Sequence, residues 1–133
     1  MSLADKKIQG APMGNEARII NVIYDFDEDG GTQADLDVLQ SDGAMICELQ
    51  HIYTETAMTS GGAALIDLGK GDGGTEFLSD KGFGDFSANA IIKPDAEAGI
   101  YLADGEKIVM GIEGADLTAG KIHFRFKCYK AGA

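Results

Sequence analysis

The segment KIHFRFKCYK, residues 121–130, has the most regular side-chain alternation in the sequence. Its apolar side is made of Ile122, Phe124, Phe126 and Cys128, and its other side of Lys121, His123, Arg125, Lys127 and Tyr129. A period of two residues predicts a β-strand, because successive side chains of a strand point to opposite sides of the sheet. We therefore expect one side of this strand to lie in the core and the other to meet solvent or a partner.

Weaker forms of the same pattern recur upstream, separated by turn residues. They predict seven more strands, at residues 17–26, 32–39, 43–56, 63–69, 90–93, 99–102 and 107–114. The Asp-Gly pairs near positions 29 and 104 predict hairpins, and residues 75–79 predict one short helical turn. No longer helical period is present, so the sequence favours an all-β fold. We expect an antiparallel β-sandwich, jelly-roll-like, with about eight short strands.

The length and composition predict a single domain. A chain of 133 residues with 44% hydrophobic residues is long enough for one core. Residues 1–16 have no periodicity and predict an irregular N-terminal arm, which leaves residues 17–133 as one β-sandwich domain. No apolar run reaches the roughly 20 residues of a membrane-spanning helix, and the first residues lack the apolar segment of a secretory signal.

The charge and the cysteines limit the partners. A net charge of -11 argues against nucleic acid and against an anionic membrane surface, because both need clustered Lys and Arg. The two cysteines, Cys47 and Cys128, lie far apart in the sequence and do not form a C-x-x-C motif. We expect both to be buried free thiols in a protein that folds in the cytosol.

The segment YDFDEDGGTQADLD, residues 24–37, begins like a calcium loop. Asp25, Asp27, Asp29 and Gly30 match the first three carboxylates and the turn glycine of an EF-hand. The twelfth position, where an EF-hand needs a bidentate Glu, is Leu36, and the flanking segments predict strands rather than helices. The segment is therefore not an EF-hand. Two alternatives stay open: a different calcium loop on Asp25, Asp27 and Asp29, and a solvated turn whose Asp side chains cap backbone amides.

The sequence contains little evidence for a catalytic site or a zinc site. No G-x-S-x-G motif is present, and the glycine-rich residues 69–74 lack the order of a phosphate-binding loop. Strand alternation places Cys128 on the opposite face from His123, and His51 has no second ligand at metal spacing. We therefore predict a protein that is not an enzyme and that has no cofactor, with calcium as the alternative.

The charges are unevenly distributed along the chain. Lys121, Arg125 and Lys127 follow one face of the final predicted strand, while seven of the 22 acids lie between residues 25 and 42. The basic face and the acidic hairpin could meet within one subunit or between neighbouring subunits. The alternative is a solvent face on an edge strand, where charges prevent aggregation.

Two segments resemble a group of small β-sandwich structural proteins of tailed bacteriophages and prophages. They are TSGGAALIDLGKGDGGTEFL at residues 59–78 and KIVMGIEGADLTAGKIHFRFKCY at residues 107–129. Between them, GIYLADGEKI is similar to the hairpin that the group has before its last strands. The matching segments cover about half the chain in the same order, but they consist of turn and packing motifs and contain no catalytic residues.

The resemblance implies a virion component that is made in the bacterial cytoplasm. We expect a head decoration or cement protein whose partners are the major capsid protein or other virion proteins, and by analogy a homotrimer. The arm and the face of Lys121, Arg125 and Lys127 are the contacts that we predict. The alternative function is a calcium-dependent β-sandwich module that binds carbohydrate or protein, although the chain has no Trp and only four Tyr for stacking on sugars.

Overall fold

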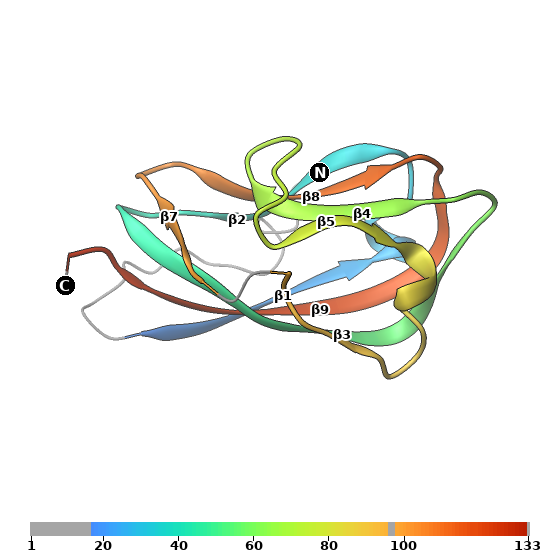
Figure 1. Ribbon diagram of the computed structural model, residues 1–133, viewed down its shortest axis with the longest axis horizontal. Coiled ribbons are helices and arrows are strands. Elements are labelled where there is room, and N and C mark those ends of the chain that lie inside the picture. The colour runs from blue at the N-terminus through green and yellow to red at the C-terminus, as the bar shows by residue number, and fades with distance from the viewer. Residues whose placement is uncertain (1–16, 96–97, 133) are drawn as a thin grey trace.

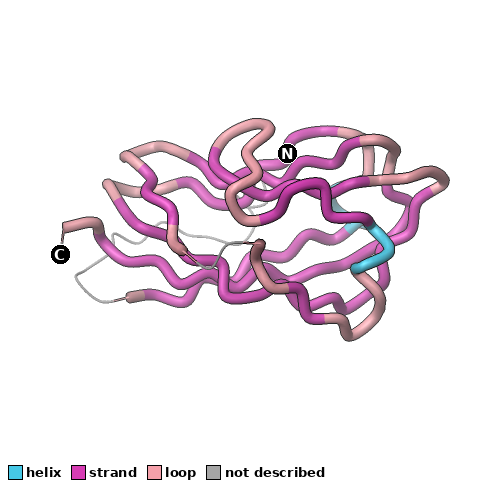
Figure 2. Tube along the Cα trace, viewed as in Figure 1, coloured by secondary structure: helices cyan, strands magenta, loops and turns pink. Residues whose placement is uncertain are grey.

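Two antiparallel sheets pack face to face in the part of the chain that the computed structural model describes, residues 17–95 and 98–132 (Figures 1 and 2). The strands are β1 (Arg18–Asp25), β2 (Ala34–Gln40), β3 (Met45–Ser60), β4 (Leu65–Lys70), β5 (Leu78–Gly82), β6 (Ile91–Ile92), β7 (Ile100–Leu102), β8 (Lys107–Glu113) and β9 (Leu117–Lys130). The helical elements are α2 (Phe26–Asp29) and a 3-10 turn, η1 (Phe83–Asp85). The predicted all-β antiparallel sandwich is confirmed.

The strand order separates the chain into two sets. Sheet A has the order β1-β9-β3-β6, with β7 also paired to β3, and sheet B has the order β2-β8-β4-β5. Strand β9 pairs with β1 on one side and with β3 on the other. The interpretation of its charged face as part of an edge strand is therefore wrong. β3 and β9 are also long strands, with 16 and 14 residues.

The core lies between the inner faces of the two sheets. The apolar side of β9 is fully buried there, as its alternation predicts: Ile122, Phe124, Phe126 and Cys128. The Phe126 ring lies 6.0 Å from the ring of Phe77 and 6.2 Å from that of Phe124, measured between centroids. On β4, Ile66 and Leu68 point into the same core. Burial of this apolar surface is the main force that holds the two sheets together.

Three local predictions are wrong. The acidic segment does not form a hairpin, because β1 belongs to sheet A and β2 to sheet B. The segment around Asp104 is not a hairpin either, since β7 pairs with β3 while β8 lies in sheet B. Residues 75–79 do not form the predicted helical turn, because buried Phe77 precedes β5 and buried Leu78 begins it. The helical elements of the described residues are α2 and η1 instead. Turn signals identify a reversal of the chain, but they do not say in which sheet the next strand finds its partner.

The predicted arm, residues 1–16, lies outside the described residues. Within the described part of the chain, no helix has both the length and the apolar character needed to span a membrane.

Candidate functional site

The three aspartates of the predicted calcium loop lie in or next to the four-residue helix α2, from its N-cap, Asp25, to its last residue, Asp29. Asp25 is the N-cap of this helix, and its carboxylate accepts a hydrogen bond from the backbone N–H of Asp27 at 3.0 Å. The carboxylate of Asp29 in turn accepts a hydrogen bond from the backbone N–H of Asp25 at 2.9 Å. These bonds satisfy amide groups that the first turn of a helix leaves without partners. The side chains of Asp25 and Asp29 therefore act as backbone caps.

The glycines after α2 let the chain cross from sheet A to sheet B. Gly30 has a φ of +76°, which an L side chain rarely adopts, and its carbonyl accepts a hydrogen bond from the Tyr24 hydroxyl at 2.6 Å. A Cβ atom on Gly31 would overlap the backbone carbonyl of Leu117, with which this segment is in contact. The Tyr24 side chain is fully buried, and burial together with the charges of Asp29 and Asp25 raises the pKa of its phenol.

A surface groove of about 330 Å³ brings the acidic segment and the basic strand together. Its charged lining consists of Asp25, Asp27, Glu55 and Lys121. The Lys121 Nζ atom lies 3.4 Å from Glu55 Oε2 and 4.0 Å from Asp25 Oδ2. The two charge features of the sequence thus meet within one subunit, at least at Lys121.

Glu55 also holds the adjacent histidine of β9. His123 Nε2 lies 2.8 Å from Glu55 Oε1, and the His123 ring lies 5.8 Å from the ring of Tyr53, measured between centroids. The hydrogen bond with His123, followed by the interactions with Lys121, lowers the pKa of Glu55. The ring of His123 is therefore fixed on the outer face of sheet A by partners on β3.

The other predicted contact residues lie farther along the same face of β9. Arg125 Nε donates a hydrogen bond to Gln50 Oε1 at 3.3 Å. Lys127 lies between Ile19 of β1 and Glu48 of β3 in the strand register. Lys121, Arg125 and Lys127 thus share the outer face of sheet A, as the alternation predicts, and their role in partner binding stays a prediction.

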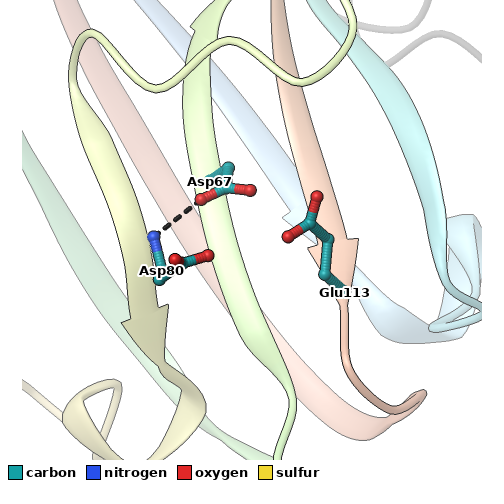
Figure 3. Close-up of side chains that lie close together, drawn as sticks. All are labelled: Asp67, Asp80 and Glu113. Atoms are coloured by element: carbon teal, nitrogen blue, oxygen red, sulfur yellow. Dashed lines mark hydrogen bonds between the residues drawn. The ribbon is translucent and has the colours of Figure 1, made fainter.

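A second charged site, which the sequence analysis missed, lies on sheet B (Figure 3). Carboxylate oxygens of Asp67 on β4, Asp80 on β5 and Glu113 on β8 all lie within 4.8 Å of one another. Asp67 is only 3% exposed, and its Oδ1 atom accepts a hydrogen bond from the backbone N–H of Asp80 at 2.7 Å. The β4–β5 register shifts between Ile66 and Leu68 at this point, so the Asp67 carboxylate supplies an acceptor where the regular ladder is interrupted.

Like charges dominate this acidic cluster of Asp67, Asp80 and Glu113. The charge of Asp67 and a hydrogen bond with its carboxyl raise the pKa of Glu113, with smaller contributions from burial, Asp80 and Asp35. Gly111 lies between Asp35 and Asp67 in the register of sheet B, where a Cβ atom would be 3.3 Å from Asp35 Oδ1. Chemically, such a cluster can share a proton, bind a hard cation or receive a basic side chain.

The only sequence signal for this cluster is Asp67 itself. It interrupts the apolar run LIDL, residues 65–68, whose neighbours are buried on both sides of it. A charged residue that is this deeply buried needs a partner, so its position could have marked a site. The identity of the partners depends on β5 and β8, which lie next to β4 only in the folded sheet.

The described residues show which of the predicted metal and thiol sites come together in the fold. Across residues 17–95 and 98–132, the acidic cluster is the one group of at least three His, Cys, Asp or Glu side chains that is close enough to share an ion. Asp25, Asp27 and Asp29 do not converge in this way, and calcium binding by them stays a prediction. Cys47 and Cys128 are buried free thiols, as predicted, and lie in the core rather than beside the solvent-facing His123.

Comparison with known proteins gives a likeness at the level of the fold. The chain matches no protein-family model and no curated protein sequence. Among solved structures, it is similar to a chain of the "Cyanophage Pam1 capsid asymmetric unit", with a TM-score of 0.57 over 92% of this chain and 90% of that chain. The two chains share 13% sequence identity, so the likeness establishes a common sandwich architecture.

Proposed function

We propose that this chain is a structural component of a bacteriophage virion, and more specifically a head decoration or cement protein. The observation that carries the proposal is the likeness to a chain of a cyanophage capsid, which covers 92% of this chain and 90% of that one. The sequence resemblance to phage β-sandwich proteins at residues 59–78 and 107–129 supports the same class through turn and packing motifs. In this proposal, the protein is not an enzyme, and it is made in the bacterial cytoplasm before it joins the virion.

Stabilisation of the shell follows from mass action in this proposal. A protein that binds the assembled lattice and not the free capsid subunits shifts the equilibrium toward the lattice. The partner is the major capsid protein or another virion protein. A protein that holds neighbouring shell subunits together needs a rigid fold. Strand pairing provides that rigidity, because the long strands β3 and β9 pair along most of their length.

The outer face of sheet A is the proposed contact surface. Lys121 is already neutralised by Glu55 and Asp25, so it has less charge to offer to a partner. Arg125 contacts the neutral Gln50 and forms no ion pair with a carboxylate among the described residues. Arg125 and Lys127 are therefore the stronger anchors for an acidic patch on the shell. A guanidinium is well suited to this role, because it pairs with carboxylates in a bidentate geometry.

The finer features of the fold and assembly belong to the same proposal. The sandwich is proposed to be a jelly roll, because the chain repeatedly crosses between sheet A and sheet B as it builds the orders β1-β9-β3-β6 and β2-β8-β4-β5. A homotrimer is proposed by analogy with decoration proteins that occupy three-fold positions. Light scattering measures the oligomer directly, and a monomer at high concentration contradicts the trimer.

Two experiments test the function. Mass spectrometry of purified virions is expected to detect this chain at high copy number, and its absence from the particles contradicts the virion proposal. Co-sedimentation of the purified protein with shells that lack it is expected to show saturable binding to assembled shells but not to free capsid subunits.

A charge-reversal pair tests the contact surface. Arg125→Glu on sheet A is expected to weaken shell binding at least tenfold, whereas Lys81→Glu on β5 of sheet B changes the net charge equally and leaves binding unchanged. Equal losses for the two variants indicate a non-specific effect of charge. A loss with Lys81→Glu alone places the contact on sheet B.

A further inference from the structure

The two cysteines face each other across the longest strand pair of the molecule. Cys47 on β3 is the direct register partner of Cys128 on β9. The neighbouring pairs, Ile46 with Tyr129 on one side and Glu48 with Lys127 on the other, keep the same register without a bulge. The positions of the two thiols are therefore fixed by a regular ladder, although 80 residues separate them in the sequence.

The spacing of such a pair suits a covalent link. Residues directly opposite each other in an antiparallel ladder have Cα atoms about 4.5 or 5.5 Å apart, and disulfides span Cα distances of about 4.4–6.8 Å. Both side chains are 0% exposed and point into the same core. The register places the two thiols side by side, and a hydrogen bond with Cys128, followed by burial, raises the pKa of the Cys47 thiol.

We propose that Cys47 and Cys128 are a disulfide-forming pair whose oxidation locks β3 to β9. In this reaction each sulfur loses one hydrogen, a bond forms between the two Sγ atoms, and one molecule of a small disulfide such as oxidised glutathione is reduced to two thiols. Because both thiols are buried, the exchange with glutathione needs a transient opening of the sheet, and the native register then brings the two sulfurs together. The free thiols of the structure are the reduced form of the pair.

The bond has a physical consequence for the whole sandwich. It closes a loop that contains β4 to β8, and a cross-link over a long loop stabilises a fold by restricting the unfolded chain. The hydrogen bond with Cys128 and burial raise the pKa of Cys47, so the thiolate that attacks an oxidant forms rarely in the folded protein and the bond forms slowly. If the protein is a virion component, a step that rests on the proposed function, the pair stays reduced in the cytoplasm and oxidises after release of the particle.

Folding should favour the cross-link, and this can be measured without any virion. The reduced chain is equilibrated in one glutathione redox buffer, with one sample refolded in native buffer and the other held in concentrated urea. After an acid quench and alkylation, intact mass counts the free thiols, because the reduced chain carries two alkyl groups and the cross-linked chain carries none. The cross-linked chain is therefore lighter by the mass that two alkylations add, plus the 2 Da of the two lost hydrogens. We expect the equilibrium constant for the intrachain disulfide to be on the order of a hundredfold larger in the folded sample.

The outcomes separate the possibilities. An equal or smaller constant in the folded sample overturns the proposal, as do glutathione adducts or interchain dimers in place of the intrachain bond. Cys47→Ala and Cys128→Ala serve as two independent controls, because each leaves one thiol and cannot give the lighter species. Failure of the shell-binding experiment leaves this result intact, so the proposed function and the disulfide are tested separately.

Discussion

The outer faces of the two sheets arrange their charged residues differently. On sheet A, Lys121 and His123 of β9 both contact Glu55 of the neighbouring strand β3. On sheet B, three carboxylates from three neighbouring strands crowd together at Asp67, Asp80 and Glu113. One face therefore has unlike charges in contact, and the other has like charges in contact.

The two exposed glutamates report this difference directly. The pKa of Glu55 is lowered by His123 and Lys121, whereas the pKa of Glu113 is raised by Asp67. Both side chains meet solvent, so the sign of the neighbouring charge decides the direction of each shift. The comparison teaches that sheet A is stabilised by its surface charges at neutral pH, while sheet B accepts an electrostatic cost that the buried Asp67 imposes.

The largest effect is expected from removal of Asp67. Asp67→Ala takes away the acceptor for the backbone N–H of Asp80 and should lower the free energy of unfolding by about 1–3 kcal/mol. Relief of the repulsion at Glu113 works in the other direction, but solvent screens it, so the lost hydrogen bond should dominate. Asp67→Asn keeps an acceptor oxygen and should cost less. Urea unfolding measures both variants, and an Ala variant as stable as the parent shows that relief of the repulsion offsets the lost hydrogen bond.

Glu113→Gln should stabilise the protein at neutral pH by a smaller amount. The folded-state pKa of Glu113 is raised, so its favourable contribution is present at acid pH and is lost as the pH rises through that pKa. The melting temperature of the variant should exceed that of the parent at pH 7, and the gap should narrow as the pH falls toward the ordinary range of a glutamate. A gap that stays constant with pH contradicts a role for the ionisation of Glu113.

Glu55→Gln is the matched variant on sheet A and should act in the opposite direction. The folded-state pKa of Glu55 is lowered, so its contribution is present above the ordinary pKa of a glutamate and is lost as the pH falls through the folded-state value. The variant should melt at a lower temperature than the parent at pH 7. The difference should disappear at a lower pH than in Glu113→Gln, and salt should reduce it. A melting temperature equal to that of the parent indicates that the pairs with His123 and Lys121 add nothing measurable.

Lys127→Ala should have the smallest effect on stability. Lys127 lies on the solvent-facing side of β9 and forms no salt bridge within 4.0 Å among the residues that the structure describes. Its removal should change the free energy of unfolding by no more than about 0.5 kcal/mol. A larger change, measured by urea unfolding, shows that the side chain supports the sheet and weakens its assignment to partner binding.

Much of the secondary structure could be predicted because alternation is a local property. The buried and solvent-facing sides of β9 and the inward positions of β4 follow directly from the period of two. The two Asp-Gly hairpins were predicted wrongly because the partner of each strand lies far away in the sequence. β1 pairs with β9 in one sheet and β2 with β8 in the other, and β7 pairs with β3 rather than with β8. The cap role of Asp25 was among the alternatives that the sequence left open.

The candidate sites divide in the same way. The residues of the basic face could be named from one segment, since strand geometry alone puts Lys121, Arg125 and Lys127 on one side. The acidic cluster could not, because it combines β4, β5 and β8, and its members meet only after sheet B has formed. The same holds for the cysteine pair, whose members were predicted to be buried but not to face each other.

The sequence by itself determined the class of fold and the two-sided character of KIHFRFKCYK, residues 121–130, because period and polarity are written in consecutive residues. Only the tertiary structure decided that this strand lies inside sheet A rather than at its edge, and that Cys128 meets Cys47 there. Pairing between distant strands depends on the joint burial of both inner faces, and no short segment carries that information.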